Sequence, residues 1–318
     1  MANGLGTLAS ALIIQRGLEM VFVRYPMLKA LSLDLSDEEV QYGQAINSRY
    51  QAIATVSDFG TGATDRADTN VSVTINAFKE VHHAFTPQEY SGSKRNLVDE
   101  SAAPIAEAIG MHILGAVAGN TSPSVAGLWV NGTYTGAELN LGGANASTAD
   151  ISYADFVTMR TALNTAGVPK NGRFCVLNGV AYGSALNDST IIEFMKNQNS
   201  GNVIQDGVLP GVAGFTVYEW PNLPLTGSSV TNARIGFCGV PQSSIFAGRL
   251  PKDPSSVIPG ASFPGNIGVV TDPGSGLSVM VNEWIDPATL KANVRCVFMY
   301  GVAAGAVTCG RVIRASAA

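Results

Sequence analysis

The stretch Val71-Ser-Val-Thr-Ile-Asn-Ala-Phe-Lys-Glu-Val-His-His-Ala-Phe85 alternates apolar and polar residues, and this alternation decides how the chain is interpreted. The apolar positions share one parity: Val71, Val73, Ile75, Ala77, Val81 and Phe85. Successive side chains of a strand point to opposite faces, so the pattern predicts one long strand with a single apolar face.

The residues before this strand predict a partner strand and a polar connection. Residues 44–56 are extended in character, and residues 57–69 contain Gly60, Gly62 and three aspartates, which is typical of an exposed loop. We therefore expect a long hairpin with this loop at its tip. Two strands alone are marginally stable in water, so we expect the hairpin to pack on a neighbouring subunit.

A long helix is predicted over about 97–118. Its apolar stripe has i, i+3 and i+4 spacing and contains Ile105, Ile109, His112, Ile113 and Ala116. Asp99 and Glu100 supply the negative charge that a helix N-terminus favours. Pro104 has to lie in or near the first turn, or it kinks the helix. We expect His112 to be a hydrogen-bonded core histidine and not a metal ligand.

The remaining elements give an α+β fold class. Residues 5–24 predict a helix that stops at Tyr25-Pro26. Ser152 and Asp155 predict the start of another, which ends at Gly167. A brief helix capped by Asp188 or Ser189 runs through Lys196, and Gly211–Gly214 is a turn. Strands are expected at 174–177, 214–220, 235–238, 244–247, 268–271, 277–284, 294–300 and 307–313.

The composition favours a protein that assembles. Charged residues make up 14% of the chain, about half the usual quarter, while 46% of the residues are hydrophobic. Protein interfaces are depleted of charge, so we expect much of the surface to lie against other copies or partners. The net charge is −5 and no basic run exceeds Lys94-Arg95, which excludes a sequence-specific DNA reader. We expect no membrane span and no signal peptide.

Motifs of catalysis are absent from the sequence, and no catalytic, cofactor-binding or metal-binding residue is predicted. The one concentration of titratable groups is Glu80, His82, His83 and Glu89. In a strand, Glu80 and His82 share one face and His83 lies on the other, so these side chains cannot converge on one ion. We expect a solvated or interface-facing strand and no cofactor.

The four cysteines, Cys175, Cys238, Cys296 and Cys309, are far apart in the sequence and form no C-x-x-C motif. This spacing fits neither a zinc ribbon nor a small disulfide framework. We expect reduced thiols that act as small apolar core residues.

The order of these segments resembles that of tailed-bacteriophage major capsid proteins, the Hong Kong 97-type shell fold. The resemblance covers nearly the whole chain. It is carried by the hairpin end Lys79-Glu-Val-His-His-Ala-Phe-Thr86, the helix Asn96–Gly119, Phe174-Cys-Val-Leu-Asn178 with Tyr182 and Leu186, Gly211-Val-Ala-Gly-Phe-Thr-Val217 before Asn222-Leu-Pro224, and Val294-Arg-Cys-Val-Phe-Met-Tyr-Gly301.

The resemblance implies a division of the chain and a function. It implies an N-terminal arm (1–45) that reaches over a neighbour, an extended loop (46–90), a peripheral domain with the spine helix (91–149 and 244–304) and an axial domain (150–243 and 305–318). It implies a major capsid protein whose hexamers and pentamers form an icosahedral shell around packaged double-stranded DNA. The protein is not expected to be an enzyme.

The implied partners are further copies of the chain, a portal protein, a separate scaffolding protein, possible decoration proteins and nonspecifically bound DNA. The implied location is the virion, assembled in the cytoplasm of the host. Some relatives join the loop to a neighbour by a Lys–Asn isopeptide bond, but residues 51–78 contain no lysine, so we expect none from this loop. Two alternatives stay open: an encapsulin-type nanocompartment shell, and a soluble strand-rich enzyme without recognisable motifs.

Overall fold

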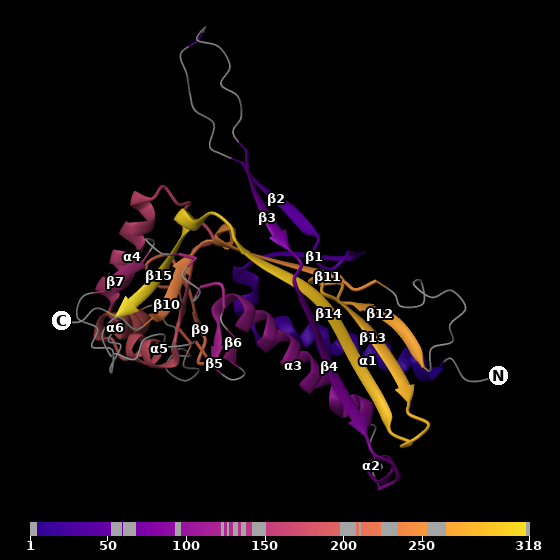
Figure 1. Ribbon diagram of the computed structural model, residues 1–318. Coiled ribbons are helices and arrows are strands. Elements are labelled where there is room, and N and C mark those ends of the chain that lie inside the picture. Colours follow the sequence, from indigo (N-terminus) through magenta and orange to yellow (C-terminus); the bar gives the residue numbers. More distant parts are fainter. Residues whose placement is uncertain are drawn as a thin grey trace.

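The structure is a computed structural model. It describes residues 5–51, 59, 68–92, 97–121, 124–125, 127–129, 133–134, 138–141, 151–197, 208–209, 211–223, 234–252 and 265–315. These residues form an elongated part, built on a large sheet, and a more compact part, built on a smaller sheet (Figure 1). A two-stranded hairpin projects from the elongated part.

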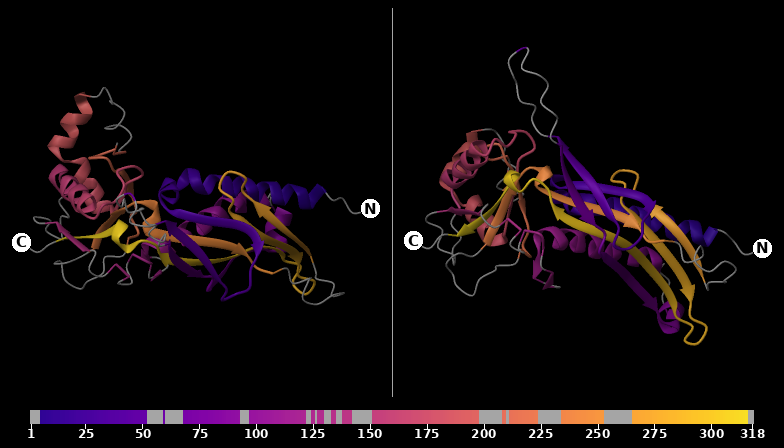
Figure 2. Two further views of the ribbon diagram at one scale, coloured as in Figure 1. Left: turned by 90° about the horizontal axis from the view of Figure 1, so that it is seen from above. Right: turned by 45° about the horizontal axis from the view of Figure 1, so that its top comes forward.

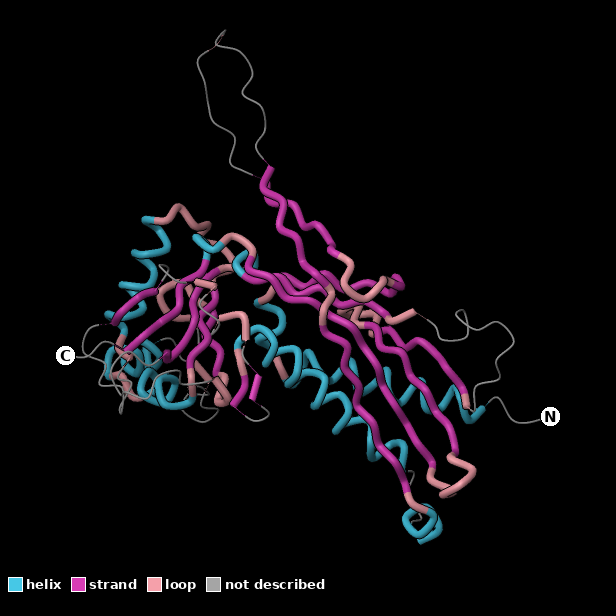
Figure 3. The backbone as a smooth tube through the Cα atoms, viewed as in Figure 1, coloured by secondary structure: helices cyan, strands magenta, loops and turns pink. Residues whose placement is uncertain are grey.

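The large sheet has the order β1-β11-β14-β13-β12, and β4 pairs with β14 beside this path. Its strands are β1 (Ser32–Glu39), β4 (Ala77–Phe85), β11 (Ser244–Leu250), β12 (Asn266–Thr271), β13 (Ser278–Ile285) and β14 (Ala292–Ala304). The helices α1 (Leu5–Arg24) and α3 (Leu97–Ala118) pack on each other and lie along this sheet (Figures 1 and 3). The 3-10 helix η1 (Pro26–Ala30) follows α1, and α2 (Pro87–Gly92) follows β4.

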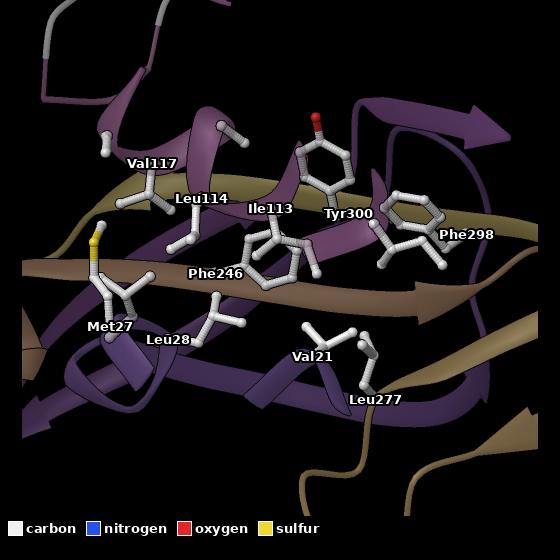
Figure 4. Packing of buried hydrophobic residues seen from close by; sticks show 14 of the residues in the cluster. Val21, Met27, Leu28, Ile113, Leu114, Val117, Phe246, Leu277, Phe298 and Tyr300 are labelled. Atoms are coloured by element: carbon white, nitrogen blue, oxygen red, sulfur yellow. The ribbon is translucent and has the colours of Figure 1, made fainter. Parts of the chain in front are cut away.

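Alternate side chains of the large sheet form the main core. Val294, Cys296, Phe298 and Tyr300 of β14 belong to one buried cluster with the apolar stripe of α3. Figure 4 shows Ile113, Leu114 and Val117 of α3 beside the aromatic side chains Phe246, Phe298 and Tyr300, with Met27 and Leu28 below Phe246. One face of the sheet is therefore covered by helices.

The smaller sheet has the order β7-β15-β10-β8-β9. Its strands are β7 (Glu138–Leu141), β8 (Phe174–Leu177), β9 (Thr216–Glu219), β10 (Arg234–Gly239) and β15 (Gly310–Ala315). The helices α4 (Tyr153–Thr165), α5 (Gly179–Leu186) and α6 (Ser189–Asn197) accompany it (Figure 2). The short elements β5 (Asn120–Thr121), β6 (Ser124–Val125), η2 (Pro241–Ser243) and η3 (Val307–Cys309) connect the two parts.

Two tryptophans fix the junction between these parts. The Trp220 indole N–H donates to the carbonyl of Gly119, just after α3, at 2.9 Å. The Trp129 ring stacks on Phe237 of β10 with 4.3 Å between centroids, and its N–H donates to Ser244 Oγ at 2.8 Å. The end of α3, the smaller sheet and the start of β11 are therefore held together by buried polar and aromatic contacts.

Several sequence predictions are confirmed. The helices expected at 5–24 and 97–118 are α1 and α3, and the strand expected at 174–177 is β8. In α4 the Asp155 carboxylate accepts the backbone N–H and the hydroxyl of Ser152, each at 2.9 Å. The turn at 211–214 is closed by Val212 N–H donating to Phe215 O.

The prediction of one long strand over 71–85 is wrong. The alternation itself holds, since Val73 and Ile75 are buried. However, the chain is strand only to Thr74 and again from Ala77, and β4 then pairs with β14 of the same chain. The break occurs because Ile75 is fully buried at the hairpin root, where its backbone N–H and C=O bond to Gln44 O and Gly43 N.

Other elements differ from the predictions. Residues 32–39, for which no strand was expected, form β1 and pair in parallel with β11, while Leu18 and Val21 of α1 are buried in the main core. The last strand begins at Gly310 and not at 307, where η3 intervenes. Pro104 lies inside α3 beyond its first turn. The helix α5 was not predicted; its N-cap Asn178 accepts from Ala181 N at 2.8 Å.

Candidate functional site

The large sheet has a second face, opposite the helices, which we call the open face. It is formed by the alternate residues that do not enter the helix-facing core: Phe78, Glu80 and His82 of β4, Asn293, Arg295, Val297 and Met299 of β14, Met280, Asn282 and Trp284 of β13, and Ile267 and Val269 of β12. No described helix covers this face; the hairpin root packs on Met299, and Phe78 and Val269 are exposed on it.

An ordered stack of side chains lies on the open face around Trp284. The ring of His82 stacks on Trp284 with 5.4 Å between centroids, and the Arg295 guanidinium lies 4.8 Å from the same ring. His82 Nε2 lies 3.0 Å from the acceptor Asn293 Oδ1, and Arg295 Nε lies 3.3 Å from Glu80 Oε2. Aromatic residues and arginine are enriched where proteins bind one another, so this stack has the composition of an interface.

An apolar groove of about 500 Å³ adjoins the stack. Its lining includes Phe78, Met280, Val297, Met299 and Ile267, with Lys252, Glu80 and Arg295 at the charged positions. Phe78 is 52% exposed, and Tyr42, which also borders the groove, is 63% exposed. The groove can accept apolar side chains, because flexible methionines adapt to the shape of what they contact.

The hairpin of β2 (Ala45–Gln51) and β3 (Asp68–Thr74) projects from the body (Figures 1 and 2). Tyr42 and Phe78, which flank it in the sequence, line the groove. Its root is a small core of Val73 and Ile75 with Ile245, Ala247 and Met299. The Tyr42 hydroxyl donates to Asn76 O at 2.6 Å and ties the entry of the hairpin to its exit. The predicted polar tip at 57–69 lies, except for Phe59 and the start of β3, outside the described residues.

The predicted titratable cluster does not converge. Glu80 and His82 lie on the open face and His83 on the opposite side of β4, as the strand period predicts. Glu89 caps α2 by accepting from the backbone N–H of Thr86 at 2.7 Å, which lowers its pKa. Within the described part of the chain, no three of the His, Cys, Asp and Glu side chains are grouped as metal ligands would be.

His112 is hydrogen-bonded, as predicted, but half-buried and not fully inside the core. Its Nε2 lies 2.7 Å from the Tyr300 hydroxyl. Burial, and secondly the charge of Lys79, lower the pKa of His112, whereas burial raises the pKa of Tyr300 to about 12. This pair joins α3 to β14.

The cysteines are free thiols, as predicted. Cys175, Cys238 and Cys296 are buried, and Cys309 is partly exposed. Burial raises the pKa of Cys238 and of Cys296 to about 12.

None of the described helices combines the length and the apolar character that crossing a membrane requires.

The sequence predictions missed Trp284 and Arg295, the centre of the open-face stack. A signal for Trp284 exists: within 277–284, Met280, Asn282 and Trp284 have the opposite parity to the buried Val279 and Val281. The stack itself depends on register, because Arg295 pairs with His82 on one side and Asn282 on the other.

Comparisons with known proteins identify the fold. No protein-family model matches the chain, and no curated protein matches it in sequence. Solved structures do match. One from Mycobacterium phage Che8 is 16% identical with a TM-score of 0.52, over 85% of this chain and 84% of its own.

Two further matches are capsids. The capsid of the Cyanophage P-SCSP1u is 13% identical with a TM-score of 0.55, and that of Ralstonia phage GP4 is 13% identical with a TM-score of 0.53. Each match extends over 91% of this chain and 87% of the capsid chain. The chain therefore has the α+β fold of tailed-phage capsid proteins, the Hong Kong 97-type fold that the resemblance implied.

Proposed function

We propose that this chain is the major capsid protein of a tailed bacteriophage and assembles, as hexamers and pentamers, into an icosahedral shell around double-stranded DNA. The observation that carries the proposal is the match to phage capsids along about nine tenths of the chain. The role is structural and not enzymatic. The protein resides in the virion and is assembled in the cytoplasm of the host.

The shape of the subunit supports assembly by head-to-tail contacts. The hairpin points away from the body (Figure 1), whereas the groove begins beside the hairpin root and the Trp284 stack lies farther along β4, β13 and β14. Two such different surfaces make a heterologous interface, and a repeated heterologous interface closes into rings when its rotation permits. In the proposed shell, the hairpin of one copy lies on the open face of the next.

The domain division remains part of the proposal. The large sheet with α1 and α3 corresponds to the peripheral domain, and the smaller sheet with α4 to α6 to the axial domain. The pairings of β1 and β4 within the large sheet support assigning residues 32–39 and 77–85 to the peripheral domain as well. The extended loop then begins and ends at the hairpin root, close to residues 45 and 74.

A low surface charge is consistent with this arrangement, because much of each subunit is covered by identical neighbours. The proposed partners are further copies of the chain, a portal protein, a separate scaffolding protein and, on the outside, possible decoration proteins. Contact with the packaged DNA is nonspecific, and no cofactor is required.

Expression of the protein alone, followed by size-exclusion chromatography and negative-stain electron microscopy, tests the proposal. Closed shells tens of nanometres across, or hexameric and pentameric rings, are the expected result. A single species near 33.0 kDa, even with a scaffolding protein supplied, would contradict it. Shells that purify with an enclosed enzyme would instead support the encapsulin-type alternative.

A further inference from the structure

The contact between α3 and the large sheet contains a polar pair inside an otherwise apolar cluster. His112 of α3 and Tyr300 of β14 are joined at 2.7 Å, and the His112 ring also meets the edges of Phe298 and Tyr300 at centroid distances of 6.2 and 5.5 Å. Tyr300 is buried and stacks on Phe246 of β11. The imidazole is therefore the group through which α3 makes a hydrogen bond to the aromatic layer of the sheet.

A cavity of about 320 Å³ lies beside His112, between α3, β4 and β14. Two charged groups line it, Lys79 and Glu80 of β4, together with Asn120 of β5. On α3 itself the nearest carboxylate in sequence is Glu107, which is ion-paired with Arg24 of α1. Glu80 is ion-paired with Arg295 across the sheet. The ammonium group of Lys79 is the charge that acts on His112.

Proton uptake by His112 has three unfavourable consequences. A neutral imidazole can accept a hydrogen bond at one nitrogen, whereas an imidazolium can only donate from both, so the Tyr300 hydroxyl can then no longer donate to it. The charge that forms is half-buried against aromatic rings, where desolvation is costly. It also lies near the charge of Lys79, whereas the carboxylate of Glu80 belongs to the open face and pairs there with Arg295.

We propose that His112 is a proton-sensitive contact that holds α3 on β4 and β14 at neutral pH and loosens this packing in acid. The device lies within one subunit. It therefore goes beyond the proposed function and can be tested on the subunit or on its assemblies alike.

The sign of the effect follows from linkage. The pKa of His112 in the folded protein is lowered from its ordinary value of 6.5, so the unfolded chain binds the proton more tightly. The neutral histidine contributes its full share of stability above about pH 6.5. That share is lost as the pH falls through the lowered folded value.

Hydrogen–deuterium exchange, read by mass spectrometry at pH 7.5 and pH 5 and corrected for the intrinsic exchange rate, tests the proposal. In the unmodified protein we expect several-fold faster exchange in α3 and β4 at the lower pH. The variant His112→Gln, which keeps a neutral hydrogen-bonding group, should lose this pH dependence. The chain has three histidines, so His82→Gln and His83→Gln are the controls for the other two. Both control variants should keep the pH dependence of exchange in α3 and β4.

An unchanged pH dependence in His112→Gln would overturn the proposal. If that variant does not fold, the exchange of the imidazole C2 hydrogen in the unmodified protein gives the pKa of each histidine directly. A pKa for His112 at or above 6.5 would then overturn it, and a lower one would support it. Neither measurement depends on shell formation, so a failure here is distinguishable from a failure of the proposed function.

Discussion

The carbonyl group of Thr74, the last residue of β3, lies directly against Gly301 in β14. A Cβ on residue 301 would stand 2.8 Å from the Thr74 carbonyl carbon and 3.1 Å from Val73 Cγ1, and closer still to the Thr74 oxygen. Cβ atoms essentially never come within 3.0 Å of such neighbours, so the contact with the Thr74 carbonyl group cannot be accommodated without a shift of the backbone. The hairpin thus crosses β14 at a position where a side chain has no room.

The variant Gly301→Ala should therefore damage the hairpin root. The methyl group forces β3 away from β14, and overpacking of this kind costs about 1–3 kcal/mol of the free energy of unfolding. Urea denaturation of the subunit measures the loss. The matched control is Gly268→Ala in β12, where nothing lies within 4 Å of the added Cβ and a change within about 0.5 kcal/mol is expected. Equal effects in the two variants would contradict the close crossing.

Replacement of Phe78 by serine should separate folding from assembly. Phe78 is 52% exposed in the groove, so its loss should change subunit stability by less than about 1 kcal/mol. If a second copy packs on the open face, the yield of rings or shells should fall strongly, because buried aromatic residues dominate interface energies. Sizing and electron microscopy measure that yield. Phe78→Leu, which keeps an apolar side chain, is the control and should assemble better than the serine variant.

The junction between the two parts of the subunit should depend on the Trp220 hydrogen bond. Trp220→Phe keeps a ring but removes the N–H, which leaves the Gly119 carbonyl without this donor. An unsatisfied buried group of this kind costs about 1–3 kcal/mol. The control is Trp284→Phe on the open face. Because the Trp284 side chain is partly exposed, this variant should lose less stability than Trp220→Phe. A larger loss of stability in the control would contradict the role given to Trp220.

Local signals in the sequence were sufficient for the helices and for several strands. The stripe of isoleucines predicts α3, and the Ser152–Asp155 pair predicts the start of α4, because both patterns act within a few residues. They were insufficient for β1, whose Leu33 and Leu35 are flanked by acidic and polar residues. Both leucines are partly buried against the main core, which is a tertiary effect.

The path of β4 and the open-face stack could not be predicted in the same way. The alternation over 71–85 continues through Ile75 and Asn76, yet the chain changes sheets there, because β4 pairs with residues some 200 positions later. His82, Trp284 and Arg295 meet only through that register. A pattern within one strand defines a face, but the neighbours on that face are set by pairings between distant segments.

The four cysteines lie in different environments, which the sequence pattern did not distinguish, and this difference gives a further prediction. The nucleophile in alkylation is the thiolate. Burial raises the pKa of Cys238 and Cys296 to about 12 and that of Cys175 well above its usual value, so at pH 8 these three thiols are almost fully protonated and also inaccessible. Cys309, in η3, is partly exposed.

A maleimide added to the native subunit at pH 8 should therefore label one thiol per chain rapidly, and mass spectrometry of the digested protein should place the label on Cys309. Cys309→Ser should abolish the rapid phase while leaving the fold intact, and Cys296→Ser should leave the rapid phase unchanged. Urea should make all four thiols reactive, because unfolding removes both the shielding and the cause of the raised pKa values. Rapid native labelling at Cys175 or Cys238 would mean that the helices over the smaller sheet open far more readily than their burial implies.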